Sequence, residues 1–161
     1  MLFRSGVCSA GVFVSTKANI TNVNLSNYSL VKEGEFAYNP SRINLGSLAL
    51  CKKQCIVSPM YEVFKIKDTN KLNPEYLLLW LQRSEFKRST LFYAIGSVRD
   101  TFDFKLLSNV KIPVPSIDTQ NKIVCIFQSL NKRKQYVDRL KNIISRVCPI
   151  LIRGSISESL R

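Results

Sequence analysis

The sequence predicts an α+β fold: a small, twisted, mostly antiparallel β-sheet domain with flanking helices, followed by one long coiled-coil-like helix. Short runs of β-forming residues, separated by turn residues, fill the first 66 of the 161 residues. A helix-start signal follows at Asn73, and beyond Pro115 apolar residues recur at helical spacing. We therefore expect one domain over residues 1–115 and a long helix with its tail over residues 116–161.

Several short strands are expected in the first part of the chain. Small and β-branched residues occupy 7–14, and the asparagine-rich stretch 19–27 is typical of turns and loops. Turn residues such as Gly34 and Pro40 then separate further β-forming runs, each long enough for one short strand. These runs cover residues 28–31, 35–38, 47–51, 55–57 and, as the clearest case, 61–67.

A helix is predicted from Asn73 to about Arg88. Asn73 suits the N-cap, Pro74 suits the first helical position, and an acidic residue follows at the positive end of the helix dipole. Leucines and a tryptophan supply a buried face. Gly96 marks a break, and residues 110–115 are expected to be extended, because each proline restricts the residue before it.

The last element is predicted to be a long helix that begins after Ser116. Its apolar residues are spaced by three, four or seven positions, which gives a heptad-like stripe with one interruption at Lys134. Pro149 is expected to end or kink the helix. We call this stripe the seam; it consists of Ile123, Phe127, Leu130, Val137, Leu140, Ile144 and Val147.

An exposed apolar stripe on a helix must be buried against something. One alternative is the body of its own domain. The other is a second long helix, from another chain or from another half of a longer protein. The spacing of the seam does not choose between them.

The chain is strongly basic, with 24 Lys and Arg against 11 Asp and Glu and a net charge of +13. Such an excess indicates an anionic partner, most often nucleic acid and sometimes an anionic membrane. No apolar run reaches the roughly 18 to 20 residues of a membrane span, and no signal peptide is recognised. We therefore expect double-stranded DNA as a partner, no membrane association and a cytoplasmic location.

Residues with catalytic potential are scarce. The chain contains no histidine, which excludes histidine-based triads and Cys–His zinc fingers. The five cysteines are odd in number and irregularly spaced, so we interpret them as free, mostly buried thiols: Cys8, Cys51, Cys55, Cys125 and Cys148. Asp100 and Asp103 are interpreted as surface or capping carboxylates. We expect no enzymatic activity, no metal site and no cofactor in this chain.

Candidate DNA-binding residues occupy predicted loops. Asn39, Ser41, Arg42 and Asn44 offer the donors and acceptors that read base edges in a major groove. On the following turn and on another loop, further cations are expected to contact phosphates or bases; these are Lys52, Lys53 and Arg99. Each could be an ordinary solvated charge, but the net charge of the chain favours binding for the set.

The predicted long helix is itself basic. From Lys122 onward it carries nine Lys and Arg against Asp138 and Glu158, a formal charge of +7. A solvated face accounts for part of this excess. A position beside a DNA backbone, or against an acidic partner subunit, would account for more of it.

Several stretches, taken in order, resemble a known family. Together they are similar to one half of the specificity subunit of a type I restriction–modification system, over about residues 20–155. The matching stretches are 28–42 (YSLVKEGEFAYNPSR), 46–47 (GS), 56–64 (IVSPMYEVF), 73–77 (NPEYL), 96–99 (GSVR) and 110–124 (VKIPVPSIDTQNKIV).

The resemblance implies a target recognition domain that reads a short DNA half-site. It also implies a spacer helix that packs against a second such helix and docks adenine DNA methyltransferase (modification) subunits. S-adenosylmethionine and ATP would then be carried by partners: the methyltransferase and a restriction/translocase subunit. The function expected from the resemblance is sequence-specific DNA recognition that directs these subunits to their site.

The chain departs from the family pattern in two ways. A full-length family member has two recognition domains and two spacer helices, and its recognition domain opens with sequence ahead of the position of Leu2. The chain is thus expected to be a half-subunit that can form a homodimer through its long helix, or a truncated remnant.

An alternative function is a half-subunit that binds the methyltransferase as a competitor or assembly factor without reading DNA. A small nuclease is disfavoured by the missing histidine and metal cluster.

Overall fold

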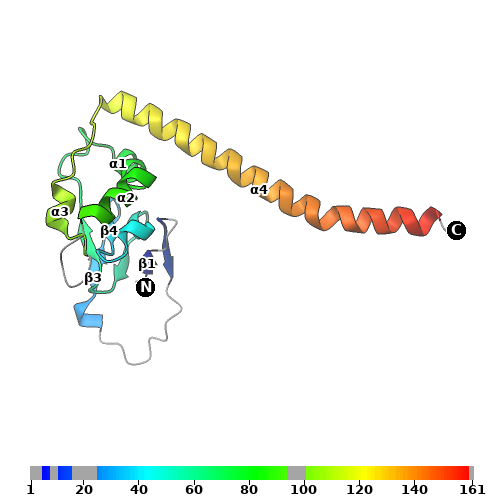
Figure 1. Ribbon diagram of the computed structural model, residues 1–161, viewed down its shortest axis with the longest axis horizontal. Helices are drawn as coiled ribbons and strands as arrows, with labels where there is room; N and C mark the ends of the chain where they lie inside the picture. Colours follow the sequence, from blue (N-terminus) through cyan, green and yellow to red (C-terminus); the bar gives the residue numbers. More distant parts are fainter. Residues whose placement is uncertain (1–4, 8–10, 16–24, 94–100, 160–161) are drawn as a thin grey trace. The chain divides into compact units, whose positions relative to one another are not determined.

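A computed structural model describes residues 5–7, 11–15, 25–93 and 101–159 (Figure 1). The chain divides into two compact units, Met1–Asn121 and Lys122–Arg161. We call the first unit the body and describe it separately from the long helix. The α+β class is confirmed, since small antiparallel sheets and short helices form the body and one long helix follows.

Two pairs of short strands lie outside the centre of the body. β1 (Ser5–Val7) pairs with β2 (Phe13–Ser15), and β3 (Ser29–Val31) pairs with β6 (Cys55–Val57). Both pairs are antiparallel, as predicted. Each strand is three residues long, and the two pairs form separate two-stranded sheets rather than parts of the single sheet that the sequence suggested.

The central sheet has three antiparallel strands. β4 (Phe36–Tyr38) lies between β5 (Leu48–Leu50) and β7 (Glu62–Phe64). All three residues of β4 are buried, because the strand has neighbours on both edges and packing on both faces. The predicted strand over 61–67 is confirmed only in its middle.

β4 divides the core into two clusters, because successive side chains of a strand point to opposite faces. Phe36 and Tyr38 join a large cluster with the helices, while Ala37 joins a smaller one with β3 and β6. Phe36 stacks on Phe64 with ring centroids 4.9 Å apart. The other buried members are Ile43, Leu48, Leu77, Leu81, Phe86, Phe102 and Leu107 on one side and Val31, Cys51, Cys55 and Val57 on the other.

The predicted helix from Asn73 to about Arg88 is wrong in its extent. Two helices occupy this region, α1 (Pro74–Leu81) and α2 (Ser84–Tyr93). The Asn73 side chain caps α1 as predicted, accepting from the Glu75 N–H at 2.8 Å. The last turn of α1 tightens where the Arg83 N–H donates to the Trp80 carbonyl at 3.3 Å, three residues back, and α2 begins anew.

A third short helix, α3 (Phe104–Ser108), was not predicted. Asp103 caps it, since its carboxylate accepts from the Leu106 N–H at 2.9 Å, and the interpretation of Asp103 as a capping residue is confirmed. Asp100 and Gly96 lie outside the described residues. Residues 110–115 form no helix or strand, in agreement with their prolines.

The long helix, α4 (Ile117–Ser159), begins after Ser116, whose hydroxyl accepts from the Thr119 N–H at 3.4 Å. It does not end at Pro149 but continues through it. Proline lacks an N–H and so removes one helical hydrogen bond, yet the turns on both sides remain helical. Figure 1 shows the helix axis bending in its orange part.

The first turn of α4 belongs to the body. Gln120 is fully buried; its Nε2 donates to the carbonyls of Lys71 and Pro115 at 2.9 and 2.8 Å, and its Oε1 accepts from the Asn73 N–H at 2.9 Å. The Asn73 side chain also donates to Asn121 at 2.8 Å. These bonds explain why the boundary between the two units follows Asn121 in the chain, shortly beyond the predicted boundary at 115–116.

The thiols differ from the prediction in part. Cys51 and Cys55 are free and buried, but Cys125 and Cys148 are free and exposed, because both lie on the solvated surface of α4. Cys8 lies outside the described residues. Within the described ranges no helix is long and apolar enough to cross a membrane.

Candidate nucleic-acid interface

The loop between β4 and β5 holds Arg42 on a rigid backbone. The Arg42 N–H donates to the Asn39 carbonyl at 3.0 Å, and the Arg42 carbonyl accepts from the N–H groups of Leu45 and Ser47 at 3.1 and 3.2 Å. Residues Ile43–Leu45 form a 3₁₀ turn, η2, which closes at Gly46 with a φ of +86°. The Arg42 side chain is exposed, so the loop presents a guanidinium from a fixed base.

Asn39 forms the foundation of this loop. It is only 5% exposed, and its Oδ1 accepts from the Ser41 N–H at 3.0 Å, which makes a side-chain-stabilised turn. In this structure Asn39 holds the loop, and its role as a DNA-reading residue stays a prediction. Ser41 is exposed and Asn44 half-buried, so both flank Arg42 at or near the surface.

Lys52 and Lys53 lie at the opposite end of the β4–β5 hairpin from Arg42. In the strand register Tyr38 pairs with Leu48 beside the Arg42 loop, whereas the lysines follow Leu50 at the other end. A strand of three residues is about 10 Å long, so the structure does not bring these lysines next to Arg42.

Both lysines are exposed, and the Lys52 Nζ lies 3.8 Å from the Glu75 carboxylate. An ion pair at such an exposed position contributes little to stability, so it leaves the lysine available to a phosphate. Arg99, the remaining predicted cation, lies outside the described residues.

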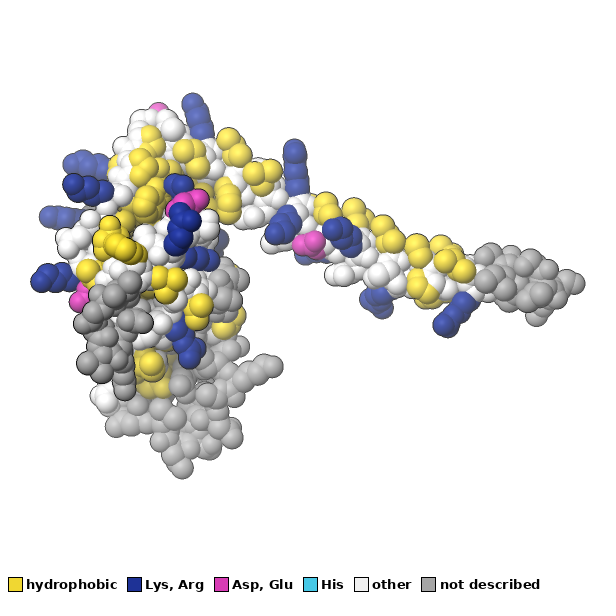
Figure 2. Space-filling model, in the orientation of Figure 1, with side chains coloured by type: hydrophobic (Ala, Val, Ile, Leu, Met, Phe, Trp, Pro, Cys, Tyr) yellow, Lys and Arg dark blue, Asp and Glu magenta, His cyan; other side chains and the backbone are white. Residues whose placement is uncertain are grey.

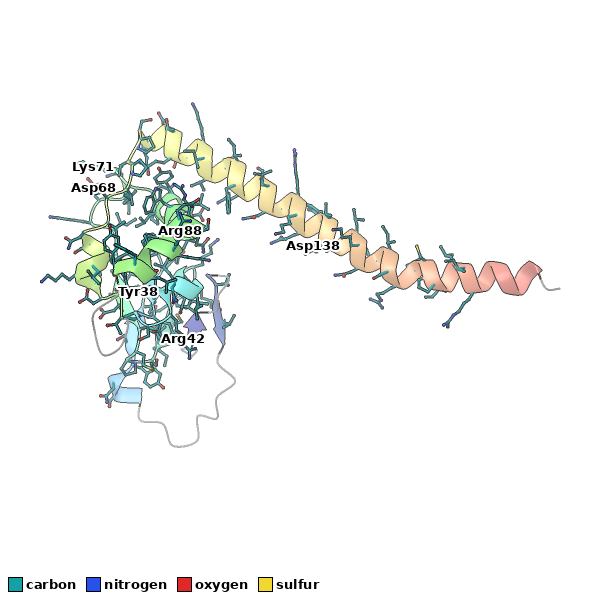
Figure 3. All side chains as sticks on the ribbon, in the orientation of Figure 1. Tyr38, Arg42, Asp68, Lys71, Arg88 and Asp138 are labelled. Carbon is teal, nitrogen blue, oxygen red and sulfur yellow. The ribbon has the colours of Figure 1, made fainter. Side chains whose placement is uncertain are left out.

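Arg88 is a basic residue that the sequence analysis did not single out. It is exposed on α2, and η2 packs against this helix. Figure 3 shows Arg42 and Arg88 on these neighbouring elements of the body. A single arginine near the end of an amphipathic helix looks like a solvated charge in the sequence; only the packing of η2 on α2 relates it to Arg42.

Two buried titratable groups, Tyr38 and Cys51, are kept neutral by their environments. Burial, with smaller effects of Glu62 and Asp103, raises the pKa of Tyr38, whose hydroxyl has no hydrogen-bond partner. Burial also raises the pKa of Cys51 to about 11, and its thiol donates to the Lys53 carbonyl at 3.1 Å. Neither group is suited to act as a nucleophile or base near neutral pH.

The body also contains an apolar pocket of about 290 Å³ between β7, α1, α3 and the extended segment before α4. Phe64, Leu77 and Phe104 are among its lining residues, and Lys65 and Lys67 are the only charged ones. The lining also includes Ser108, but it contains no carboxylate or thiol that could act as a base toward that hydroxyl. Across the described part of the chain, no cluster of three or more potential metal ligands occurs.

Comparison with known proteins identifies the family. The model of the type I restriction modification DNA specificity domain matches residues 7–146, which is most of the chain. The chain belongs to this family. The specificity domain is a DNA-recognition domain rather than a catalytic one, in agreement with the predicted absence of enzymatic activity.

Two solved structures share the fold of this specificity domain. The HsdS subunit from Thermoanaerobacter tengcongensis superimposes with a TM-score of 0.73 at 23% identity, over 93% of this chain and 40% of that chain. A chain from a structure on complex assembly and conformational transition of the type I R-M system gives a TM-score of 0.66 at 21% identity, over 95% of this chain and 40% of that chain. The present chain therefore spans less than half the length of either.

Proposed function

We propose that this specificity domain reads a DNA half-site and directs methyltransferase and restriction subunits to it. The observation that carries the proposal is the family match over residues 7–146, together with an exposed arginine on a rigid loop of a strongly basic chain. Arginine can bond both acceptors on the major-groove edge of guanine, and a fixed backbone gives that contact its direction.

The roles of the surface residues follow from their positions. Ser41, Arg42 and Asn44 would contact base edges, with Asn39 supporting their loop. Lys52 and Lys53 lie at the far end of the hairpin. They would contact phosphates about 10 Å along the duplex from the bases that Arg42 contacts. Arg99 is assigned to the DNA surface on sequence grounds alone.

The exposed seam of α4 supports pairing with a second long helix. Every seam residue is 40% or more exposed, and Figure 2 shows a row of hydrophobic side chains along the helix. One heptad position is apolar in five successive repeats: Ile123, Leu130, Val137, Ile144 and Leu151. Such a repeat is characteristic of helices that pack against another helix.

A second copy of this chain is the proposed owner of that second helix. This chain spans 40% of each solved chain that it resembles, so two copies together approach the length of one such chain. The seam is interrupted once, at Lys134, which lies seven residues after Phe127. One buried polar residue in a seam lowers the stability of a pair but fixes its register.

The methyltransferase and restriction/translocase subunits are proposed partners of the assembled dimer. S-adenosylmethionine and ATP would be bound by those subunits and not by this chain.

Selection from random duplex DNA tests the proposal. The full chain, alone and with a co-expressed type I methyltransferase, should retain a defined short sequence at moderate salt. Retention of the methyltransferase without any sequence enrichment would instead support the alternative of a half-subunit that acts as a competitor or assembly factor. The exposed seam favours this alternative as strongly as it favours the dimer.

A further inference from the structure

The end of α2 exposes three large apolar side chains. Leu91, Phe92 and Tyr93 are 53%, 72% and 61% exposed, while Phe86 and Thr90 form the buried side of the same helix. The Phe92 and Tyr93 rings meet edge to face, with centroids 5.6 Å apart. These side chains are not members of the core clusters of the body, and they are not part of the seam. A contiguous exposed group of this kind marks an interaction surface.

One arginine lies beside this apolar group and another precedes the neighbouring element η2. Arg88 precedes Leu91 by three residues and Phe92 by four, which places all three on one side of α2. η2, which packs against α2, adds the exposed Leu45 and is preceded by Arg42. Figure 2 shows both cationic and apolar side chains on the visible face of the body. We call this surface the arginine–aromatic face; it consists of Arg42, Leu45, Arg88, Leu91, Phe92 and Tyr93.

The charge of this face selects an anionic partner. Among the described residues neither Arg42 nor Arg88 forms an ion pair. The one acid of α2, Glu85, accepts a hydrogen bond from Arg83 at 3.2 Å. The pKa of Glu85 is lowered, first by its own backbone N–H and then by Arg83, so its charge is already compensated. Arg88 therefore brings an unpaired guanidinium group to the same side of α2 as Phe92, and Arg42 adds a second beside the neighbouring η2.

We propose that the arginine–aromatic face binds duplex DNA and that Phe92 inserts between two base pairs. This inference rests on the proposed function and adds a contact that reads the deformability of a base step. Arg42 and Arg88 would hold phosphates or base edges on either side, and Tyr93 would support the Phe92 ring through the contact described above. Apolar side chains inserted in this way unstack a base step, and pyrimidine–purine steps open most readily.

Local unstacking can be detected directly. The full chain is mixed with a duplex that carries its selected site, with 2-aminopurine placed at each position in turn. Binding should raise the fluorescence at one step by at least threefold, because unstacking relieves quenching. Phe92→Ala should abolish this rise and weaken binding about tenfold, while Phe92→Leu, which keeps an apolar wedge, should retain much of it.

Met60→Ala is the matched control, since Met60 is a similarly exposed apolar side chain, at 66%, in the turn between β6 and β7. It should leave both affinity and fluorescence unchanged. Circular dichroism and the urea midpoint of each variant establish that it is folded. Arg88→Ala should weaken binding to all sequences and lower the salt dependence of affinity.

The outcomes separate this inference from the proposed function. Tight, sequence-specific binding with no fluorescence change at any step, and with Phe92→Ala equal to the unmodified chain, would overturn the inference alone. Absence of any sequence-specific binding would overturn both. Intact DNA binding by Phe92→Ala with loss of methyltransferase capture, or of binding to anionic vesicles, would assign the face to a protein or membrane instead.

Discussion

At the scale of single residues, Arg42 and Gln120 use their polar groups in opposite ways. Arg42 projects from a loop in which its own backbone N–H and carbonyl are both hydrogen-bonded, and its exposed side chain is available to a partner. Gln120 is fully buried, and both ends of its amide are bonded within the body. The sequence alone suggested the first role, because an arginine after an Asn-Pro-Ser turn reads as a loop residue. It gave no sign of the second, since glutamine is usually exposed.

Arg42→Ala should weaken specific DNA binding by about 1–3 kcal/mol and relax the preference at one base pair. Arg42→Lys should restore general affinity but not that preference, because lysine lacks the planar fork that binds guanine at two points. Titration of single-base variants of the selected site measures both effects. The control Lys105→Ala removes one exposed charge from α3 and should preserve the preference. Equal discrimination by Arg42→Ala and the unmodified chain would contradict the assignment.

Gln120→Leu should destabilise the body by about 2–4 kcal/mol, since it leaves two carbonyls and one N–H unpaired in a buried site. Urea unfolding followed by the fluorescence of Trp80, which belongs to the body, gives the measurement. Gln54→Leu, at an exposed turn, is the matched control and should change the unfolding free energy by less than about 0.5 kcal/mol. A similar loss in both variants would show that the Gln120 bonds are of little consequence.

Cys51 should resist alkylation at moderately alkaline pH. With a pKa of about 11, roughly one thiol in a thousand is ionised at pH 8, against about one in ten at the ordinary value of 9.0. The thiolate is the reactive form, so the rate should rise about tenfold for each pH unit below pH 11. Peptide mass analysis after iodoacetamide treatment compares Cys51 with the exposed Cys125. Equal rates at the two sites would contradict the buried, neutral thiol.

At the scale of elements, the strands were the most predictable part of the chain. Turn residues such as Gly34 and Pro40 separate the β-forming runs, and β3 to β7 fall inside those runs. β1 and β2 overlap only the two ends of the predicted run 7–14. The division between α1 and α2 was missed, because Gln82, Arg83 and Ser84 include neither glycine nor proline. The break arises from tightened backbone bonding, which leaves no signal in composition.

The seam of α4 was predicted from spacing, and the structure leaves each of its residues exposed. Leu140→Asp should abolish pairing of two long helices, because it places a charge in the middle of an apolar contact. Gln135→Asp adds the same charge on an exposed part of α4 away from the seam and should leave pairing intact. Sedimentation shows the oligomeric state, and the urea midpoint of the body should be the same in both variants. A Leu140→Asp chain with an unchanged oligomeric state would rule out seam pairing.

At the scale of the whole molecule, the basic charge and the single recognition domain limit what the chain can recognise. A net charge of +13 favours salt-dependent attraction to DNA phosphates, which does not depend on the base sequence. The basic composition of the sequence indicated nucleic acid as a partner. The order of its motifs indicated the family whose model matches residues 7–146. The sequence could not locate the arginine–aromatic face, because η2 and α2 are far apart in the chain and are related only by their packing against each other.

If two chains pair with two-fold symmetry, the selected DNA should contain two identical half-sites in inverted orientation, separated by a fixed spacer. Symmetry of the protein imposes this arrangement on its site. High-throughput sequencing of the selected duplexes gives the half-sites and the spacer length directly. Enrichment of a single half-site, or of two unrelated halves, would contradict the homodimer and favour pairing with a different specificity subunit.

The way the β4–β5 loop is closed has a consequence for how new specificities arise. Its shape depends on backbone hydrogen bonds, on the buried Ile43 and on a glycine with positive φ, whereas Ser41, Arg42 and Leu45 point outward. Side chains at these outward positions can be exchanged without opening the core. A few substitutions in this loop would therefore change the DNA sequence that the domain recognises. Each exposed substitution should change the free energy of unfolding by no more than about 0.5 kcal/mol.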